Sequence, residues 1–344
     1  MENVKRPAPV DPELRRRIED LIRYKGGGYN EGIVADVVET ALKMLTDVRS
    51  RGDARVMQTT LRELRYQYRL FTAYSGRRRV CIFGSARTHA EEPEYILARE
   101  FAQQIVEAGF MVITGAGPGI MQAGNEGAGP EQSFGCNIRL PWEQAANPVL
   151  EQDKKLITFK YFFTRKFTFI RQSDAVVLFP GGFGTLDEGF EALTLMQTGK
   201  SRLMPLVLID RPGGTYWKSF QHYVEAHLLR SGLVSEDDLH LYQVTTDPAE
   251  AVRWIRRFYR NFHSVRFVRD LLVIRLQHPP AESAVQGLNE DFKDIISGEP
   301  FRVISATPEE REDNDNVDLG RVAFGFNRRN YGRLRQLIDV LNGF

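Results

Sequence analysis

The sequence predicts an α/β protein organised around a doubly wound parallel sheet, with helices before it and a small α+β appendage after it. Between residues 77 and 263, short apolar runs alternate with amphipathic stretches of helical length, as strands and crossover helices do in such sheets. Three of the apolar runs end in glycine turns, at 84, 115–119 and 181–184. Ligands of doubly wound sheets bind beyond the carboxyl ends of the strands, where these turns are expected to lie.

We divide the chain into a helical N-terminal segment (1–76), a Rossmann-like domain (77–263) and a small α+β C-terminal domain (264–344). In the first segment, Glu31–Leu45 and Ala54–Tyr74 carry apolar residues at helical spacing. Amphipathic helices of this kind need an apolar surface. We expect them to cover the central sheet or to pair with another subunit.

Strands and helices alternate in the central domain as right-handed crossover units require. The expected strands are Val80–Phe83, Phe110–Thr114, Phe134–Leu140, Leu156–Phe162, Asp174–Phe179, Pro205–Ile209 and Leu241–Thr245. The expected helices are Pro93–Ala108, a stretch ending at Ala128, Thr164–Gln172, a helix beginning at Thr185, Trp217–Leu229 and Pro248–Phe262.

The C-terminal domain is expected to mix strands and helices. Strands are expected within 265–276, 301–306 and 321–326, and helices at 280–296 and 331–341. We interpret the acidic stretch 309–318 as a solvated loop. No motif assigns this domain a role, and regulation or subunit contact is a hypothesis.

Composition excludes several classes of function. The 46 Lys and Arg residues against 45 Asp and Glu give a formal charge of +1, so no overall attraction to nucleic acid or to an anionic membrane is expected. We interpret Arg77-Arg78-Arg79 as a solvated edge of the first strand. The N-terminus has no apolar leader and no run has the length of a membrane span, which favours a cytoplasmic protein.

Neither cysteine nor histidine shows the spacing of a metal site. Cys81 and Cys136 lie in apolar, strand-like runs and are expected to be core residues in a reducing compartment. The six histidines lack the H-E-x-x-H pattern. We therefore expect neither a metal nor a cofactor.

The most informative stretch, residues 174–196, combines an apolar strand, a glycine turn and a helix start. Gly181, Gly182 and Gly184 allow close approach of the backbone to a ligand, and a helix start favours an anion, so phosphate is expected here. Thr185-Leu186-Asp187-Glu188 also fits a capping box. On this local pattern alone, capping is the favoured role of Glu188, whereas the glycines indicate a binding site.

Spacing excludes two common nucleotide sites. A G-x-G-x-x-G fingerprint at Gly115 and Gly117 would need a glycine at the position of Ile120. None of the glycine turns continues as Gly-Lys-Ser/Thr, so a Walker A loop is absent as well. A mononucleotide or sugar phosphate, held by several backbone turns, remains.

The sequence then resembles a known family. The stretch from Pro180 to Glu188 matches P-G-G-x-G-T-x-x-E, and Arg165-Lys166 stand upstream on an expected helix. Together they resemble the signature of the LOG family, phosphoribohydrolases that release a cytokinin base from its riboside 5′-monophosphate. Members are often mislabelled lysine decarboxylases. Supporting stretches are 83–85, 115–121 and 137–144, and the resemblance covers roughly residues 78–260.

The resemblance implies a site made by several turns. It implies that Gly182, Gly184 and Thr185 hold the 5′-phosphate. The implied catalytic residues are Arg165 and Glu188. The residues assigned to substrate binding are Gly84, Ser85, Gly117, Gly119, Glu143, Lys166, Gly181, Gly182, Gly184, Thr185 and Thr194. The chain departs from the family's triple-glycine turn at Ala116, and the spacing from Glu143 to Arg165 is longer than in short plant-type members.

These residue types suit the chemistry. Cleavage of an N-glycosidic bond builds positive charge on the ribose, which a fixed carboxylate such as Glu188 stabilises. Arg165 can neutralise phosphate or donate to the leaving base. The sequence does not distinguish these roles.

Three functions are weighed. The first is hydrolysis of nucleoside 5′-monophosphates, either AMP-like or a cytokinin riboside monophosphate, to free base and ribose 5-phosphate. The second is a non-catalytic carrier or sensor of a nucleotide or of a phosphorylated cofactor such as a molybdopterin. The third, decarboxylation, would need pyridoxal phosphate on a lysine, and no acidic partner for its ring can be singled out. We expect the first, with no nucleic-acid or membrane partner, in a homodimer or higher homo-oligomer.

Overall fold

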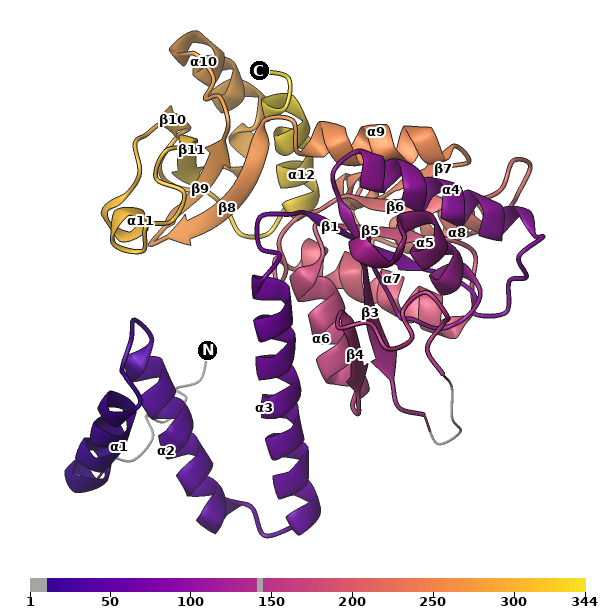
Figure 1. Ribbon diagram of the computed structural model, residues 1–344. Helices are drawn as coiled ribbons and strands as arrows, with labels where there is room; N and C mark the ends of the chain where they lie inside the picture. The colour runs from indigo at the N-terminus through magenta and orange to yellow at the C-terminus, as the bar shows by residue number, and fades with distance from the viewer. Residues whose placement is uncertain (1–10, 141–144) are drawn as a thin grey trace. The chain divides into compact units, whose positions relative to one another are not determined.

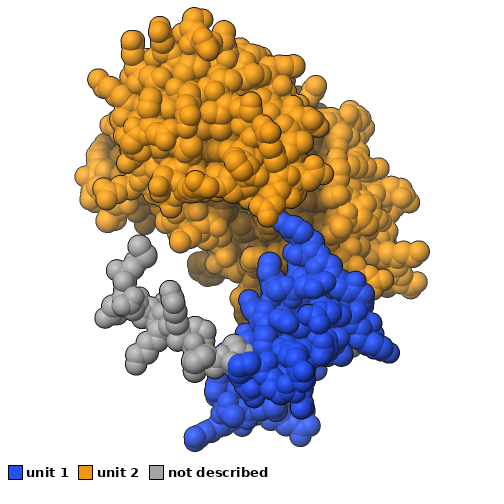
Figure 2. All heavy atoms as spheres, turned by 90° about the vertical axis from the view of Figure 1, so that its left-hand side faces the viewer, with its two compact units in different colours: residues 1–65 blue, residues 66–344 orange. Residues whose placement is uncertain are grey.

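The computed structural model describes residues 11–140 and 145–344. The chain divides into two compact units, one ending at Arg65 and one from Tyr66 to Phe344 (Figure 2). The second unit begins at Tyr66 rather than at residue 77, because the C-terminal end of the helix at 51–72 belongs to it. Phe71 stacks on Phe134 with ring centroids 4.6 Å apart, and Gln172 donates a hydrogen bond of 2.8 Å to Gln67. The division into three domains stays a prediction.

The N-terminal helices are α1 (Pro12–Tyr24), α2 (Glu31–Asp47) and α3 (Arg51–Thr72), as the helical spacing predicted. Asp11 caps α1 by accepting a hydrogen bond from the backbone of Glu13. Arg15 of α1 pairs with Asp36 of α2 at 2.6 Å. Within the described residues, every helix of the chain is too short or too polar to traverse a membrane.

The second unit contains the predicted doubly wound sheet, seven parallel strands in the order β4-β3-β2-β1-β5-β6-β7 (Figure 1). The strands are β1 (Arg79–Phe83), β2 (Met111–Thr114), β3 (Ser133–Ile138), β4 (Leu156–Phe159), β5 (Ala175–Leu178), β6 (Leu206–Ile209) and β7 (Gln243–Thr245). Cys81 of β1 and Cys136 of β3 are fully buried free thiols in the core, as predicted. The strand order reverses between β1 and β5, which is the switch point where such sheets bind ligands.

Helices cover both faces of this sheet and bury separate apolar clusters. They are α4 (Pro93–Glu107), α5 (Ile120–Ala128), α6 (Phe162–Gln172), α7 (Phe183–Gln197), α8 (Tyr216–Tyr223) and α9 (Pro248–Phe258). Residues of α4, α5 and α9 pack together in one cluster, and those of α6, α7 and α8 in the other. Several expected strands are shorter than predicted: for example, β3 ends at Ile138, β4 ends before α6 begins at Phe162, and β7 begins only at Gln243.

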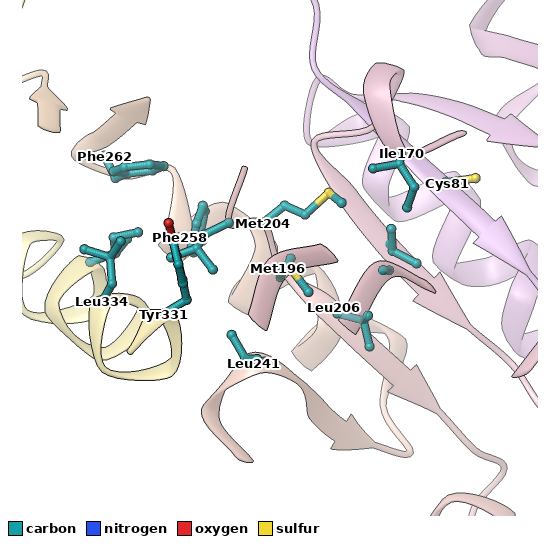
Figure 3. Packing of buried hydrophobic residues seen from close by; sticks show 14 of the residues in the cluster. Cys81, Ile170, Met196, Met204, Leu206, Leu241, Phe258, Phe262, Tyr331 and Leu334 are labelled. Atoms are coloured by element: carbon teal, nitrogen blue, oxygen red, sulfur yellow. The ribbon is translucent and has the colours of Figure 1, made fainter. Parts of the chain in front are cut away.

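A second, antiparallel sheet of four strands follows in the order β10-β11-β9-β8. Its elements are β8 (Phe262–Val268), β9 (Leu271–Leu276), α10 (Glu282–Asp291), β10 (Arg302–Val303), α11 (Pro308–Glu312), β11 (Gly320–Gly325) and α12 (Tyr331–Leu341). Tyr331 and Leu334 of α12 belong to the same apolar cluster as Met196 and Leu241 (Figure 3). The two sheets therefore share one continuous core.

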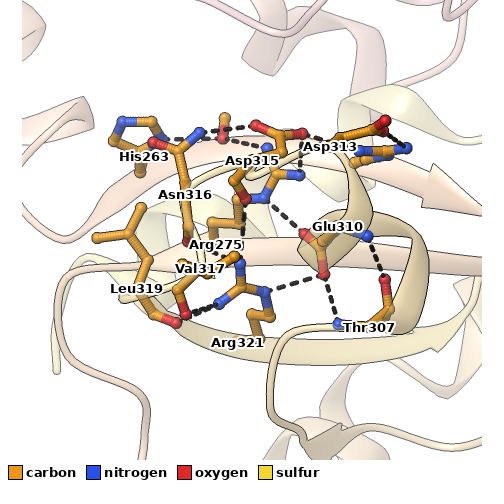
Figure 4. A network of polar contacts seen from close by, with 12 residues as sticks. His263, Arg275, Thr307, Glu310, Asp313, Asp315, Asn316, Val317, Leu319 and Arg321 are labelled. Atoms are coloured by element: carbon orange, nitrogen blue, oxygen red, sulfur yellow. Dashed lines mark hydrogen bonds and ion pairs between the residues drawn. The ribbon is translucent and has the colours of Figure 1, made fainter.

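The interpretation of residues 309–318 as a solvated loop is only partly right, because most of them are exposed but a short helix and the buried Glu310 interrupt the loop. Thr307 and Glu310 form a capping box that starts the short helix α11. Glu310 is fully buried and accepts hydrogen bonds from Arg275 at 2.7 Å and Arg321 at 3.0 Å (Figure 4). Although burial acts in the opposite direction, the hydrogen bonds from the Thr307 backbone and the two arginines lower the pKa of Glu310.

The triple arginine is not a solvated edge either. Arg79 is buried, and its Nε donates a 2.8 Å hydrogen bond to the backbone carbonyl of Gln172. The guanidinium of Arg78 lies over the ring of Tyr259, 3.7 Å from its centroid. A run of three charges does not show whether the side chains are solvated. Here Arg78 and Arg79 contact specific partners in the second unit.

Candidate active site

A cavity of about 720 Å³ lies at the carboxyl ends of β1 and β5, where the sheet topology predicts a ligand. Its walls are the turn after β1 (83–87), the turn after β5 with the start of α7 (181–188), Met121 of α5, and Phe162 and Arg165 of α6. The structure thus brings eight predicted residues to one cavity: Gly84, Ser85, Arg165, Gly181, Gly182, Gly184, Thr185 and Glu188.

The glycines of this site fall into two kinds. A Cβ on Gly84 would lie 2.6 Å from the Ile120 side chain, and one on Gly181 would lie 2.1 Å from Oγ1 of Thr185, so packing requires both. By contrast, a Cβ on Gly182 or Gly184 would meet no atom within 4 Å. The latter two glycines therefore leave space on the cavity side rather than filling a structural need.

The start of α7 supplies free backbone donors to the cavity. The helix begins at Phe183, two residues earlier than predicted, and its cap residue Gly182 has no side chain to satisfy the first turn. Among the described residues, the N–H groups of Phe183 and Gly184 have no hydrogen-bond acceptor. Such an end carries partial positive charge and suits a phosphate.

The capping-box interpretation of Thr185 and Glu188 is wrong. Because α7 starts at Phe183, Thr185 is its third residue and cannot cap it. Glu188 is 7% exposed, and its Oε2 accepts no hydrogen bond from any part of the chain that the structure describes. A buried carboxylate oxygen without a donor is rare in folded proteins and points to a function. Burial raises the pKa of Glu188 to about 7, against the lowering effect of Lys166 and Arg165.

Among the described residues, one hydrogen bond holds Arg165 in place and leaves its outer nitrogens without an acceptor. Its Nε donates to the backbone carbonyl of Cys136 at 2.7 Å, and its guanidinium lies 5.0 Å from the ring centroid of Phe169. A Cβ on Gly115 would lie 2.5 Å from an outer nitrogen of Arg165. Gly115 therefore leaves the space that the guanidinium group of Arg165 occupies. Burial lowers the pKa of Arg165, although Glu188 acts in the opposite direction, and a guanidinium remains charged nonetheless.

Residues around this cavity are similar in sequence to several known proteins. Residues 116–255 match the family described as "Possible lysine decarboxylase". Over 171 residues the chain is 27% identical to the pyrimidine/purine nucleotide 5′-monophosphate nucleosidase of Escherichia coli strain K12. It is 29% identical over 163 residues to the probable cytokinin riboside 5′-monophosphate phosphoribohydrolase of Oryza sativa subsp. japonica.

Residues 116–255 are therefore similar to phosphoribohydrolases of the LOG family. The match with the nucleosidase covers 47% of this chain and 36% of that enzyme, and the match with the rice protein covers 46% and 63%. Among solved structures, the molybdenum cofactor binding protein of Rippkaea orientalis is similar over 52% of this chain and 96% of its own, with 17% identity and a TM-score of 0.38.

Lys166, the other basic residue of the LOG-family motif, is engaged with acidic side chains of α7. Its Nζ lies 2.6 Å from Glu191, 3.0 Å from Asp187 and 3.6 Å from Glu188. Although burial acts in the opposite direction, the hydrogen bonds with Glu191 and Asp187 raise the pKa of Lys166. A lysine that forms a Schiff base must lose its proton, so this environment disfavours the decarboxylase chemistry in the family's label.

Besides Lys166, three of the predicted residues that the structure describes do not line the cavity. Gly119 supports it from behind: its φ is +65°, and a Cβ there would lie 2.3 Å from the carbonyl oxygen of Ser85. Gly117 accepts a hydrogen bond from Asn147 at 3.1 Å. Thr194 lies more than two turns beyond Thr185 on α7 and lines a separate, apolar cavity of about 200 Å³. Glu143 lies outside the described residues.

Several further residues of the cavity were not predicted from the sequence. These are Phe83, Ala86, Arg87, Met121, Phe162, Phe183, Leu186 and Asp187, which also line the cavity. Phe162 is 55% exposed at the start of α6. A large aromatic residue one helical turn before Arg165 is a signal that could have identified it, because bases are often stacked on aromatic rings.

Proposed function

We propose that this protein hydrolyses the N-glycosidic bond of nucleoside 5′-monophosphates to give free base and ribose 5-phosphate. The observation that carries the proposal is the buried Oε2 of Glu188, to which none of the described residues donates a hydrogen bond, in one cavity with an uncapped helix start and Arg165. The names of the E. coli and rice relatives support the same reaction class.

The start of α7 would bind the 5′-phosphate. Its free N–H groups and partial positive charge favour a dianion, and the space beside Gly182 and Gly184 admits the phosphate oxygens. Glu188 follows Gly184 by one helical turn on the same face. A nucleotide held by its phosphate would therefore have its ribose next to the carboxylate.

Glu188 and Arg165 would then act on the bond between C1′ and the base nitrogen. As that bond breaks, its electron pair leaves with the base and positive charge builds at C1′, where the Glu188 carboxylate stabilises it. Water adds to C1′ and loses a proton, which a carboxylate with a pKa near 7 is suited to accept. Glu188 then releases this proton to solvent, and the departing base takes one up to become the neutral free base. The outer nitrogens of Arg165 would neutralise the phosphate or donate to the departing base.

The base would lie toward the apolar part of the cavity. Met121 and Phe162 line it there, and neither side chain reads the pattern of donors and acceptors that distinguishes one base from another. AMP-like nucleotides and cytokinin riboside monophosphates both fit this description, and we favour AMP-like substrates.

A panel assay tests the proposed function. The full chain is incubated with AMP, GMP, CMP, UMP and a cytokinin riboside monophosphate, and free base and ribose 5-phosphate are measured by chromatography. Release is expected from at least one nucleotide, abolished in Glu188→Gln and retained in Glu236→Gln, an exposed carboxylate outside the cavity. Binding of a nucleotide without release of base from any of them would instead show a carrier or sensor.

We further propose a cytoplasmic homo-oligomer. Phe162, Phe163 and Phe167 of α6 expose 55%, 52% and 44% of their surface, which is typical of a contact surface rather than of isolated apolar residues. Light scattering coupled to size-exclusion chromatography would measure the mass. A monomer at micromolar concentration would contradict this part of the proposal.

A further inference from the structure

A second cavity, of about 640 Å³, lies at the amino ends of the strands, opposite the candidate active site. Residues 76–78 before β1, residues 108–110 before β2, and the end of α9 with the residues after it form its walls. The arginines that line it are Arg77, Arg78, Arg253, Arg256, Arg257 and Arg260. Among the described residues, the lining includes no carboxylate.

Three of these arginines are held in position by neutral groups. Arg78 lies over the ring of Tyr259, whose hydroxyl donates to the backbone of Asp174 at 2.6 Å. Arg77 donates to the side-chain oxygen of Gln132, and Arg260 donates to the backbone carbonyl of Asn342. Neutral groups thus orient all three guanidinium groups, and of the three only Arg78 also has a carboxylate of the described residues within 4 Å.

The nearby carboxylates balance only part of this positive charge. Arg253 pairs with Asp247 at 3.3 Å, and Arg78 is 3.8 Å from Asp174, which also contacts Arg202 at 3.4 Å. The side chains of Arg256 and Arg257 have no ion pair or hydrogen bond with any residue in 11–140 or 145–344.

A purely structural role explains only some of the cluster. Arg256 and Arg257 lie in the last turn of α9, where cations stabilise the helix dipole. Arg77 and Arg78 come from a different segment and gain nothing from that dipole. Guanidinium groups gathered in one cavity without matching acids repel one another, and a bound anion would relieve this repulsion.

We propose that this cavity binds a small anion with at least two phosphate groups. The planar donors of arginine match phosphate oxygens, and guanidinium groups on several walls can contact more than one phosphate. A volume of about 640 Å³ is in the range of small-molecule sites. The proposal goes beyond the nucleotide reaction, because the two cavities lie at opposite ends of the strands.

Single-stranded nucleic acid fits this cavity less well. Proteins bind such strands by stacking bases on aromatic rings as well as by charge. Of the aromatic residues in the lining, Phe110 is only 6% exposed and the ring of Tyr259 is covered by Arg78. The site therefore presents charge without a stacking surface.

Calorimetric titration of the full chain with inorganic tripolyphosphate tests the proposal. Tripolyphosphate is expected to bind more tightly than orthophosphate. Arg256→Gln/Arg257→Gln is expected to weaken it about tenfold or more, since charge-assisted hydrogen bonds are lost. The matched control, Arg230→Gln/Arg329→Gln, removes two exposed arginines outside the cavity and is expected to bind like the wild type. A second titration, with ATP in place of tripolyphosphate, distinguishes an inorganic polyphosphate from a nucleoside polyphosphate as the ligand. Equal affinity indicates that the cavity recognises the phosphate chain alone, and tighter binding of ATP indicates a nucleoside polyphosphate.

Three results would overturn the proposal. The first is no binding of tripolyphosphate, or equal weakening in both double variants. The second is displacement of tripolyphosphate by saturating AMP in Glu188→Gln, which would place the anion in the candidate active site. The third is tighter binding of a single-stranded oligonucleotide that depends on Arg256 and Arg257, which would identify a nucleic-acid surface. None of them affects the assay for base release.

Discussion

Nζ of Lys166 lies 3.6 Å from Oε2 of Glu188, farther than from the carboxylates of Glu191 and Asp187, at 2.6 and 3.0 Å. The lysine divides its charge among three acids, and none of the described residues donates a hydrogen bond to this oxygen. Burial therefore dominates, and the pKa of Glu188 rises to about 7 instead of falling as it would in a close ion pair.

The rate of base release is expected to depend on the ionisation of Glu188. If the carboxylate is the active form, the rate rises with pH and reaches half its maximum near pH 7. Lys166→Met removes a charge that lowers this pKa, so the midpoint is expected to move to higher pH. Lys200→Met, an exposed lysine outside the cavity, leaves the midpoint in place. A midpoint that Lys166→Met does not move would contradict the assigned role of the pair.

The same pKa predicts how stability changes with pH in Glu188→Gln. The folded-state pKa is raised above the ordinary value of 4.5, so the contribution of the protonated carboxyl is complete below pH 4.5 and lost as pH rises through 7. At pH 8 the wild type carries a buried charge that the variant lacks. The variant is expected to be more stable there, by about 1.4 kcal/mol for every tenfold difference in proton affinity between the folded and unfolded wild type.

Urea unfolding at pH 8 and pH 5 measures this difference. The advantage of Glu188→Gln should shrink as pH falls, because the wild-type carboxyl takes up its proton. An equal difference at both values would mean that packing, rather than ionisation, separates the two proteins. Glu236→Gln serves as the control, since Glu236 is exposed and lies outside the cavity.

The sequence predicted the sheet and the position of its site because both follow from local patterns. The apolar runs around Cys81 and Val176 have the length of internal strands, and the turn at 181–184 is recognisable from its glycines alone. The start of α7 was misplaced, because a glycine cap leaves no side-chain signal. That error produced the false capping role of Glu188.

Long-range contacts account for what the sequence did not predict. Glu310 was interpreted as part of a solvated loop, and its burial depends on Arg275 and Arg321, which lie on two neighbouring strands. Thr194 was assigned to the phosphate turn through the family resemblance, although the helix carries it to another cavity. Periodicity shows which residues share a helix face and does not show what that face contacts.

The two kinds of glycine predict opposite effects of alanine. At Gly184 a Cβ meets no atom within 4 Å, so Gly184→Ala is expected to leave stability unchanged or slightly higher. The new methyl group would occupy the space assigned to phosphate, so affinity for the nucleotide should fall. Gly119→Ala places a Cβ 2.3 Å from the backbone of Ser85 at a φ of +65° and is expected to lower the unfolding free energy by roughly 2 kcal/mol or more. Thermal unfolding and nucleotide titration of both variants measure this contrast; a destabilised Gly184→Ala with normal affinity would refute the phosphate site.

The buried arginine cluster of the second sheet predicts the largest loss of stability. Glu310→Gln would leave Arg275 and Arg321, which are 4% and 0% exposed, without the carboxylate that bridges them. Breaking a buried pair in this way costs about 3 to 5 kcal/mol. Glu309→Gln is the matched control, because Glu309 pairs with the exposed Arg269 and such surface pairs contribute about 1 kcal/mol or less.

Because Tyr331 and Leu334 join both sheets in one apolar cluster, we expect Tyr66–Phe344 of Glu310→Gln to unfold in a single transition at lower denaturant concentration. Separate loss of the C-terminal sheet, detected as an early transition by hydrogen exchange, would show that the shared core does not couple them.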